Sequence, residues 1–196
     1  MNNVLRTFIK NTLVNRSLKV LLLRVGGVFL FFLLSLFLTN FFDPEIVGRY
    51  DFTRSTLLIL GGICLLGTNQ AIIYYSGVLV AQDSLGGLQR VYQKMVTIIV
   101  GTSLVFLVLV LLIPDSFFNT FFEKADASEL VFKIVLALSA FAMTMLNIDT
   151  LRGLKRTLFS ELYRNIFRYL PFFLGAILLF ATQNAHWLVE VYLLGF

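Results

Sequence analysis

Hydrophobic residues occur in long blocks separated by short polar stretches. A bilayer core of about 30 Å is crossed by roughly 20 apolar residues in helical form. None of the blocks shows the period-two alternation over about ten residues that is typical of a membrane barrel strand. The pattern predicts five membrane-spanning helices, and a further apolar run from residue 187 is expected to be a truncated sixth span. The five predicted spans are 20–38, 57–80, 95–113, 130–146 and 163–180.

Composition supports this interpretation. The 196 residues are 58% hydrophobic and 14% charged, with a mean hydropathy of +0.86, whereas a soluble domain is about half apolar and a quarter charged. We therefore expect an all-α integral membrane protein, a polytopic transmembrane helix bundle forming one membrane domain over 1–196. The single cysteine, Cys64, excludes an intrachain disulfide and a cysteine-based metal site. No metal or cofactor is expected, and the net charge of +5 is attributed to topology rather than to nucleic acid.

The distribution of Lys and Arg predicts the orientation. Eleven basic residues belong to one set of alternate connections and four to the other, which also carries most of the acids. Because positive charge stays on the cytoplasmic side, we expect a cytoplasmic N-terminus. The cytoplasmic set is Arg6, Lys10, Arg16, Lys19, Arg90, Lys94, Arg152, Lys155, Arg156, Arg164 and Arg168. The outer set is Arg49, Arg54, Lys124 and Lys133.

Two cytoplasmic stretches have an amphipathic pattern. Residues 1–18 place apolar side chains opposite basic ones, and residues 149–165 repeat leucine at three- and four-residue steps among basic residues. Such segments lie in the headgroup layer, where anionic lipid attracts them. Each could be a moving linker between spans or a passive interfacial anchor.

The second span follows a helix-start signal. Asp43, Pro44 and Glu45 suit an N-cap, a first helical position and a first turn. A helix from Pro44 to Val80 has 37 residues, about 55 Å at 1.5 Å per residue. Because this length exceeds the bilayer, we expect the helix to project or to bend at its glycines.

A polar and small-residue stripe follows one face of that helix if the helix is straight. At 100° per residue, Asp51 and Asn69 share one angle, and Arg54, Ser55 and Gly62 lie near it. A stripe of this kind avoids lipid, so it faces either other helices or a water-filled cavity.

Arg24 is a charge inside the first apolar block. It lies five residues beyond Lys19, about 7 Å deeper along a helix. This depth allows the side chain to snorkel back to the headgroups. Alternatively, Arg24 faces an inner cavity, where its guanidinium could bind phosphate in a bidentate manner.

The order of several short motifs resembles the start of polysaccharide biosynthesis proteins of the O-antigen flippase type, in the multidrug/oligosaccharidyl-lipid/polysaccharide exporter superfamily. The motifs are FFDPEIVGRYDF with Gly48-Arg49-Tyr50, then LLILGGICLLGTNQAIIYYSG with Leu66-Gly67, then the basic stretch NIDTLRGLKRTLFSELYRNIFRYL. The likeness covers nearly the whole chain, and its specificity lies in the order and spacing of the motifs.

The resemblance implies a non-enzymatic transporter with two lobes that rock by alternating access in a bacterial inner membrane. Its cargo would be an undecaprenyl-diphosphate-linked oligosaccharide, and this chain would be the N-terminal lobe, with the C-terminal lobe missing. Charged residues on the first two spans of such proteins line the cavity. The substrate-binding candidates here are Arg24, Asp51, Arg54, Asn69 and Gln70. The arginines would contact phosphate, the two amides would contact the glycan, and Asp51 would release a coupling proton or sodium ion.

Two other functions remain open from the sequence. An ion-coupled exporter of cationic small molecules would need cavity acids, whereas most charges within the spans are basic. A membrane-embedded transferase of envelope biosynthesis would need a general base or metal-binding acids. His186 is the one histidine available, and it has no acid pair beside it.

Overall fold

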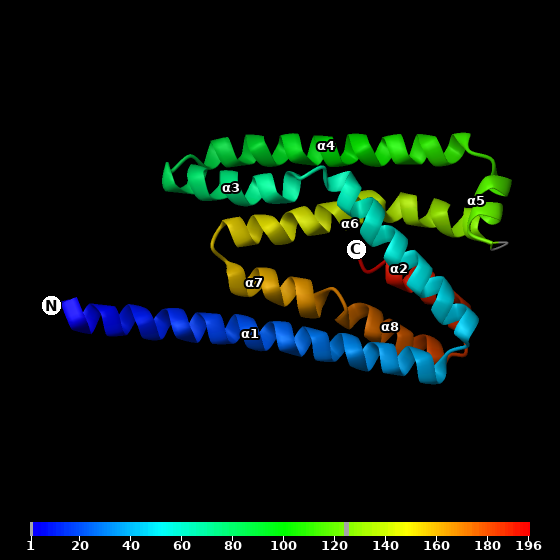
Figure 1. Cartoon of the computed structure of the whole chain (residues 1–196), viewed down its shortest axis with the longest axis horizontal. Coiled ribbons are helices and arrows are strands. Elements are labelled where there is room, and N and C mark those ends of the chain that lie inside the picture. The colour runs from blue at the N-terminus through cyan, green and yellow to red at the C-terminus, as the bar shows by residue number, and fades with distance from the viewer. Residues whose placement is uncertain (1, 124–125) are drawn as a thin grey trace.

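The computed structural model describes the backbone of residues 2–123 and 126–196, and side chains from residue 14 onward apart from Arg16. Every regular element in these ranges is helical (Figure 1). The elements are α1 (Asn2–Phe41), α2 (Pro44–Leu65), α3 (Thr68–Ala81), α4 (Leu85–Leu112), α5 (Asp115–Phe121), α6 (Ala127–Gly153), α7 (Thr157–Leu162), the π-helical turn η1 (Tyr163–Phe167), α8 (Leu170–Ala181), the 3₁₀ turn η2 (Ala185–Trp187) and α9 (Leu188–Leu193).

The helices have the length and apolarity that membrane spans require. Four segments of the described chain can each cross a bilayer, and α2 and α3 together make one more, bent span, which is the second of the five in chain order. The protein is therefore an all-α membrane bundle, in agreement with the five spans expected from the hydrophobic blocks. The four unbroken spans are Ser17–Phe41, Leu85–Leu112, Ala127–Gly153 and Thr157–Ala181.

Helix α6 occupies the centre of the bundle. It packs against α2, α3 and α4, and its residues Ile134, Leu138 and Leu146 are completely buried. The α3–α4 pair lies on one side of α6, and α1 lies on the other side beside α7 and α8 (Figure 1). Many large apolar side chains of α1 stay exposed, as expected for a helix that faces lipid.

The second span is bent, as its length and glycines predict. The axes of α2 and α3 differ by 51°. The break lies at Leu66 and Gly67, which have φ angles of 44° and 78°, a left-handed conformation that glycine adopts at no steric cost. Gly61 and Gly62, the other candidate bend points, lie within regular helix α2.

The bend removes Asn69 from the predicted polar stripe, whose other members all lie on α2. Asp51 and Arg54 lie on α2, whereas Asn69 lies on α3 beyond the break. The helical wheel at 100° per residue assumed one continuous helix. The two left-handed residues interrupt it, so α3 has a different axis and its side chains no longer continue the angular spacing of those on α2. Asp51 and Asn69 therefore do not share one helix face.

The two amphipathic segments are divided differently in the structure. Residues 2–18 continue without a break into the first span, and the side chains up to residue 13 lie outside those described. Residues 149–165 are shared between the end of α6, a turn at 154–156, α7 and the start of η1. They form no single interfacial helix, because a tight turn separates α6 from α7. Lys155 in this turn has a left-handed conformation, with φ 60°.

Candidate functional site

Arg24 has a specific partner. Its Nη2 donates a hydrogen bond of 2.6 Å to Oε1 of Glu161, at the end of α7. The Arg24 side chain is 57% exposed, whereas that of Glu161 is only 4% exposed. Glu161 therefore anchors the ion pair inside the bundle. The structure favours this pairing over snorkelling as the reason for a charge inside the first span.

Glu161 belongs to a larger network of charged groups. Arg152 Nη2 also donates to Glu161 Oε1, at 3.0 Å, and its Nη1 lies 3.8 Å from Asp149 Oδ1. Arg164 Nη2 donates to the same Asp149 oxygen at 2.6 Å. The network joins α1, α6, α7 and η1 with two buried carboxylates and three arginines. It thus neutralises both acids and keeps one positive charge in excess.

A close helix contact allows α1 to reach this network. A side chain at Gly27 would collide with Asn165 on η1. Asn165 Nδ2 in turn donates to Glu161 Oε2 at 3.0 Å and to the Glu161 carbonyl at 2.9 Å. Small residues let helix backbones approach closely in membranes. Gly27, three residues after Arg24, therefore lets α1 approach η1 closely enough for the Arg24–Glu161 ion pair to form.

Asp51 and Arg54 line a second, smaller site. They border a cavity of about 200 Å³ between α1 and α2, together with Tyr50 and Ser35. Arg54 Nη1 lies 3.9 Å from Asp51 Oδ1, and its guanidinium carbon lies 4.4 Å from the centre of the Phe31 ring, a cation–π contact. The structure thus brings these two predicted residues together.

The remaining predicted residues lie elsewhere. Asn69 is half-buried and Gln70 is exposed, both in the first turn of α3. Arg24 lines neither the Asp51–Arg54 cavity nor the largest one described. The five residues proposed from the sequence therefore belong to three separate regions rather than to one site.

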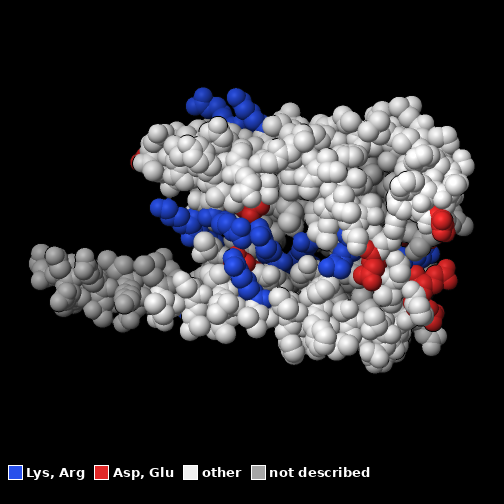
Figure 2. Space-filling model, viewed as in Figure 1, with Lys and Arg blue, Asp and Glu red and all other residues white. Residues whose placement is uncertain are grey.

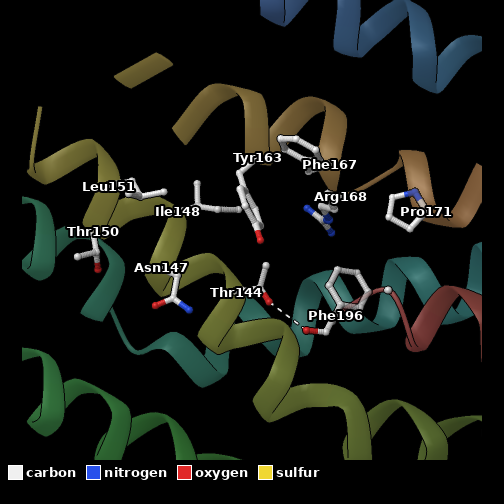
Figure 3. Close-up of a pocket in the computed structure, with 11 residues that line it drawn as sticks. Thr144, Asn147, Ile148, Thr150, Leu151, Tyr163, Phe167, Arg168, Pro171 and Phe196 are labelled. Carbon is white, nitrogen blue, oxygen red and sulfur yellow. Dashed lines mark hydrogen bonds between the residues drawn. The ribbon is translucent and has the colours of Figure 1, made fainter. Parts of the chain in front are cut away.

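The largest cavity described lies between α6 and Thr157–Ala181, the fifth span in chain order. Its volume is about 730 Å³, within the usual range for small-molecule sites. Its wall combines polar and aromatic side chains, and in Figure 3 the Tyr163 hydroxyl and the Arg168 guanidinium point into the space between the helices. The lining residues include Thr144, Asn147, Tyr163, Phe167, Arg168 and Phe196.

Aromatic rings hold Arg168 in this wall. Its guanidinium carbon lies 5.0 Å from the Phe141 ring centre, 5.5 Å from that of Tyr169 and 5.3 Å from that of Phe196. None of the ion pairs in the described part of the chain includes Arg168, and the Arg168 Nε is buried without a hydrogen-bond partner. Arg168 is therefore a cation held in place but not neutralised.

The charged network around Glu161 and the cavity beside Arg168 lie along one band of basic residues, which we call the basic seam. In Figure 2, Lys and Arg side chains form a band across the face of the molecule, between α6 and the row formed by α1, α7 and α8, while acidic side chains collect mainly at the end of the bundle near α5. Three arginines of this region are bonded to Glu161 or Asp149, so the attraction for an anionic ligand comes from the one excess charge of that network and from Arg168.

Sequence reasoning missed the residues of this seam because it assigned 149–165 to a basic amphipathic connection and counted Arg168 only as one of the basic residues that set the topology. Asp149 and Glu161 are acids on either side of a basic turn, twelve residues apart. Two acids in an otherwise basic segment were the available signal. Arg168 carried a similar signal, since it comes only three residues before Pro171 and a wholly apolar run.

Comparisons with protein-family models, with curated proteins and with solved structures gave no match.

Proposed function

We propose that this protein forms one lobe of a membrane transporter that moves a lipid-linked oligosaccharide diphosphate across a bacterial inner membrane by alternating access. The seam between α6 and the fifth span would receive the diphosphate and the first sugars. The lipid tail would remain in the bilayer. The protein would act by binding and changing conformation, with no chemical step.

Arg168 is the observation that carries this proposal. It lies twelve residues beyond Arg156, about 18 Å further along the fifth span by helical rise. That distance places it near the middle of a bilayer of about 30 Å. A charge at such a depth marks a substrate or ion path by default. Arg168 borders the largest cavity described, and no ion pair in the described part of the chain neutralises its charge, so an anion in the cavity would be attracted to it.

The lining of the cavity suits a glycan diphosphate in other respects. Asn147 accepts a hydrogen bond from the Tyr92 hydroxyl at 2.7 Å and keeps its amide nitrogen for a ligand. The exposed rings of Tyr163 and Phe167, 5.6 Å apart between centres, offer apolar faces to sugars. Arg168 would bind the phosphate and these groups the glycan.

The buried acids weigh against a cationic cargo. Asp149 and Glu161 are each bonded to arginine, so neither is available to a cationic drug. Asp51, by contrast, is 59% exposed and 3.9 Å from Arg54. An ion-coupled exporter could use Asp51, and in the flippase proposal Asp51 is the group that releases a coupling proton or sodium ion.

A transport assay in cells tests the proposal. The complete gene would be expressed in a strain that needs it for surface polysaccharide. We expect Arg168→Ala to reduce export of the polysaccharide by more than about 90%, since a tenfold loss corresponds to a single lost interaction of about 1.4 kcal/mol. Surface glycan would be measured beside the amount of protein in the membrane. Arg90→Ala is the matched control, because Arg90 is exposed on α4 and away from the seam. Normal export by a well-inserted Arg168→Ala protein would contradict the proposed role.

A further inference from the structure

An apolar groove runs between α1 and α7 on the outside of the bundle. Its volume is about 440 Å³, and apolar side chains form nearly all of its wall. Lys19 is the one charged residue among those that line it. The lining residues are Lys19, Leu22, Leu23, Leu158, Phe159 and Leu162.

The register of the two helices brings cations together at the mouth of the groove. Helix α1 and the fifth span run in the same direction (Figure 1), and Arg24 pairs with Glu161. Five residues earlier on each helix, about 7 Å by helical rise, lie Lys19 and Arg156 at the same level. Lys155 lies in the adjoining turn.

These mouth cations differ from those within the bundle. Arg24, Arg152 and Arg164 each bond to a buried carboxylate. In the described part of the chain, Lys19 and Arg156 are exposed and form no ion pair or side-chain hydrogen bond. An apolar groove that opens beside unpaired cations is complementary to a molecule with an anionic head and an apolar tail.

We propose that this groove is a binding site for an anionic phospholipid of the leaflet in which the 154–156 turn lies. One acyl chain would lie along Leu23, Phe159 and Leu162, and the headgroup phosphate would contact Lys19 and Arg156. The lipid would join α1 to α7 on the outer surface, as Glu161 joins them inside. This site is separate from the seam, and the proposal does not depend on the cargo of the transporter.

Native mass spectrometry of the purified full chain tests the site. The chain would be equilibrated with phosphatidylglycerol or phosphatidylcholine bearing the same acyl chains, and retained lipid would be counted. We expect phosphatidylglycerol to be retained in preference to phosphatidylcholine. The double variant Lys19→Gln/Arg156→Gln should retain at least about fivefold less phosphatidylglycerol, since each cation near an anionic headgroup contributes about that factor.

The control removes the same charge elsewhere at the same end of the bundle. Arg90 and Lys94 are exposed on α4, and Arg90→Gln/Lys94→Gln should leave phosphatidylglycerol retention unchanged. A second variant, Phe159→Ser, should lower retention of the lipid by removing apolar wall without changing charge. Size-exclusion profiles and melting temperatures would verify that each variant is folded. Equal retention of both lipids by the wild type, or equal losses in the charge variant and its control, would overturn the proposal.

Discussion

Replacing Glu161 with glutamine is expected to destabilise the protein by about 1.5–3 kcal/mol, because the charge-assisted hydrogen bonds that its carboxylate accepts from two partly exposed arginines are lost. Glu161 Oε1 accepts from both Arg24 and Arg152, and its own side chain is almost completely buried. Glutamine retains the shape and one acceptor, so no cavity forms. The expected loss therefore arises from the charge alone.

Thermal unfolding in detergent, followed by size exclusion, measures this effect. Glu45→Gln is the control, since Glu45 is an exposed acid with no ion pair in the described chain and its loss should change the melting temperature little. The double variant Arg24→Gln/Glu161→Gln should be more stable than Glu161→Gln, because one of the two stranded cations is removed as well. If Glu161→Gln melts at the wild-type temperature, the network is not a stabilising core of the bundle.

Replacing Gly61 with leucine is expected to be nearly as damaging. A Cβ at Gly61 would overlap the ring of Phe141 on α6, at a contact between α2 and the central helix. Overpacking of a filled core costs about 1–3 kcal/mol, occasionally more, and here the first added atom already collides. We expect the variant to be poorly folded or to separate α2 from α6.

The next residue supplies the control for this experiment. Gly62 has no atom within 4 Å of an added Cβ and is exposed, so Gly62→Leu adds the same apolar side chain toward lipid. It should keep or raise the melting temperature, since leucine is the better helix former. Similar melting temperatures for Gly61→Leu and Gly62→Leu would show that α2 does not pack on α6 as described.

The spans were predictable because they depend on a local property, the length of each apolar block. The bend of the second span was also predictable in general, from a 37-residue helix that contained glycines. Its position was less accessible, since Gly61 and Gly67 look alike in the sequence. Only packing distinguishes them: Gly61 fits against Phe141 within regular helix, whereas Gly67 has a positive φ.

The charged groups were less predictable because their partners are distant in sequence. Arg24 and Glu161 are 137 residues apart, so the charge in the first span could be explained only after α1 and α7 were placed side by side. The helical wheel failed for a related reason, since it carried Asp51 and Asn69 through a break. Arg168 was counted only among the basic residues that set the topology. Its position beside the cavity, which depends on the packing of the fifth span against α6, could not be derived from the sequence.

Binding of a lipid diphosphate is the most direct test of the proposed function. Purified protein in nanodiscs would be titrated with undecaprenyl diphosphate and, separately, with undecaprenol, which has the same tail and no charge. We expect saturable binding of the diphosphate, weak binding of the alcohol, and at least about tenfold weaker diphosphate binding by Arg168→Gln, since charged hydrogen bonds contribute about 1.5–3 kcal/mol. Equal binding of the two lipids, or unchanged diphosphate binding by a folded Arg168→Gln protein, would contradict an anion site in the seam.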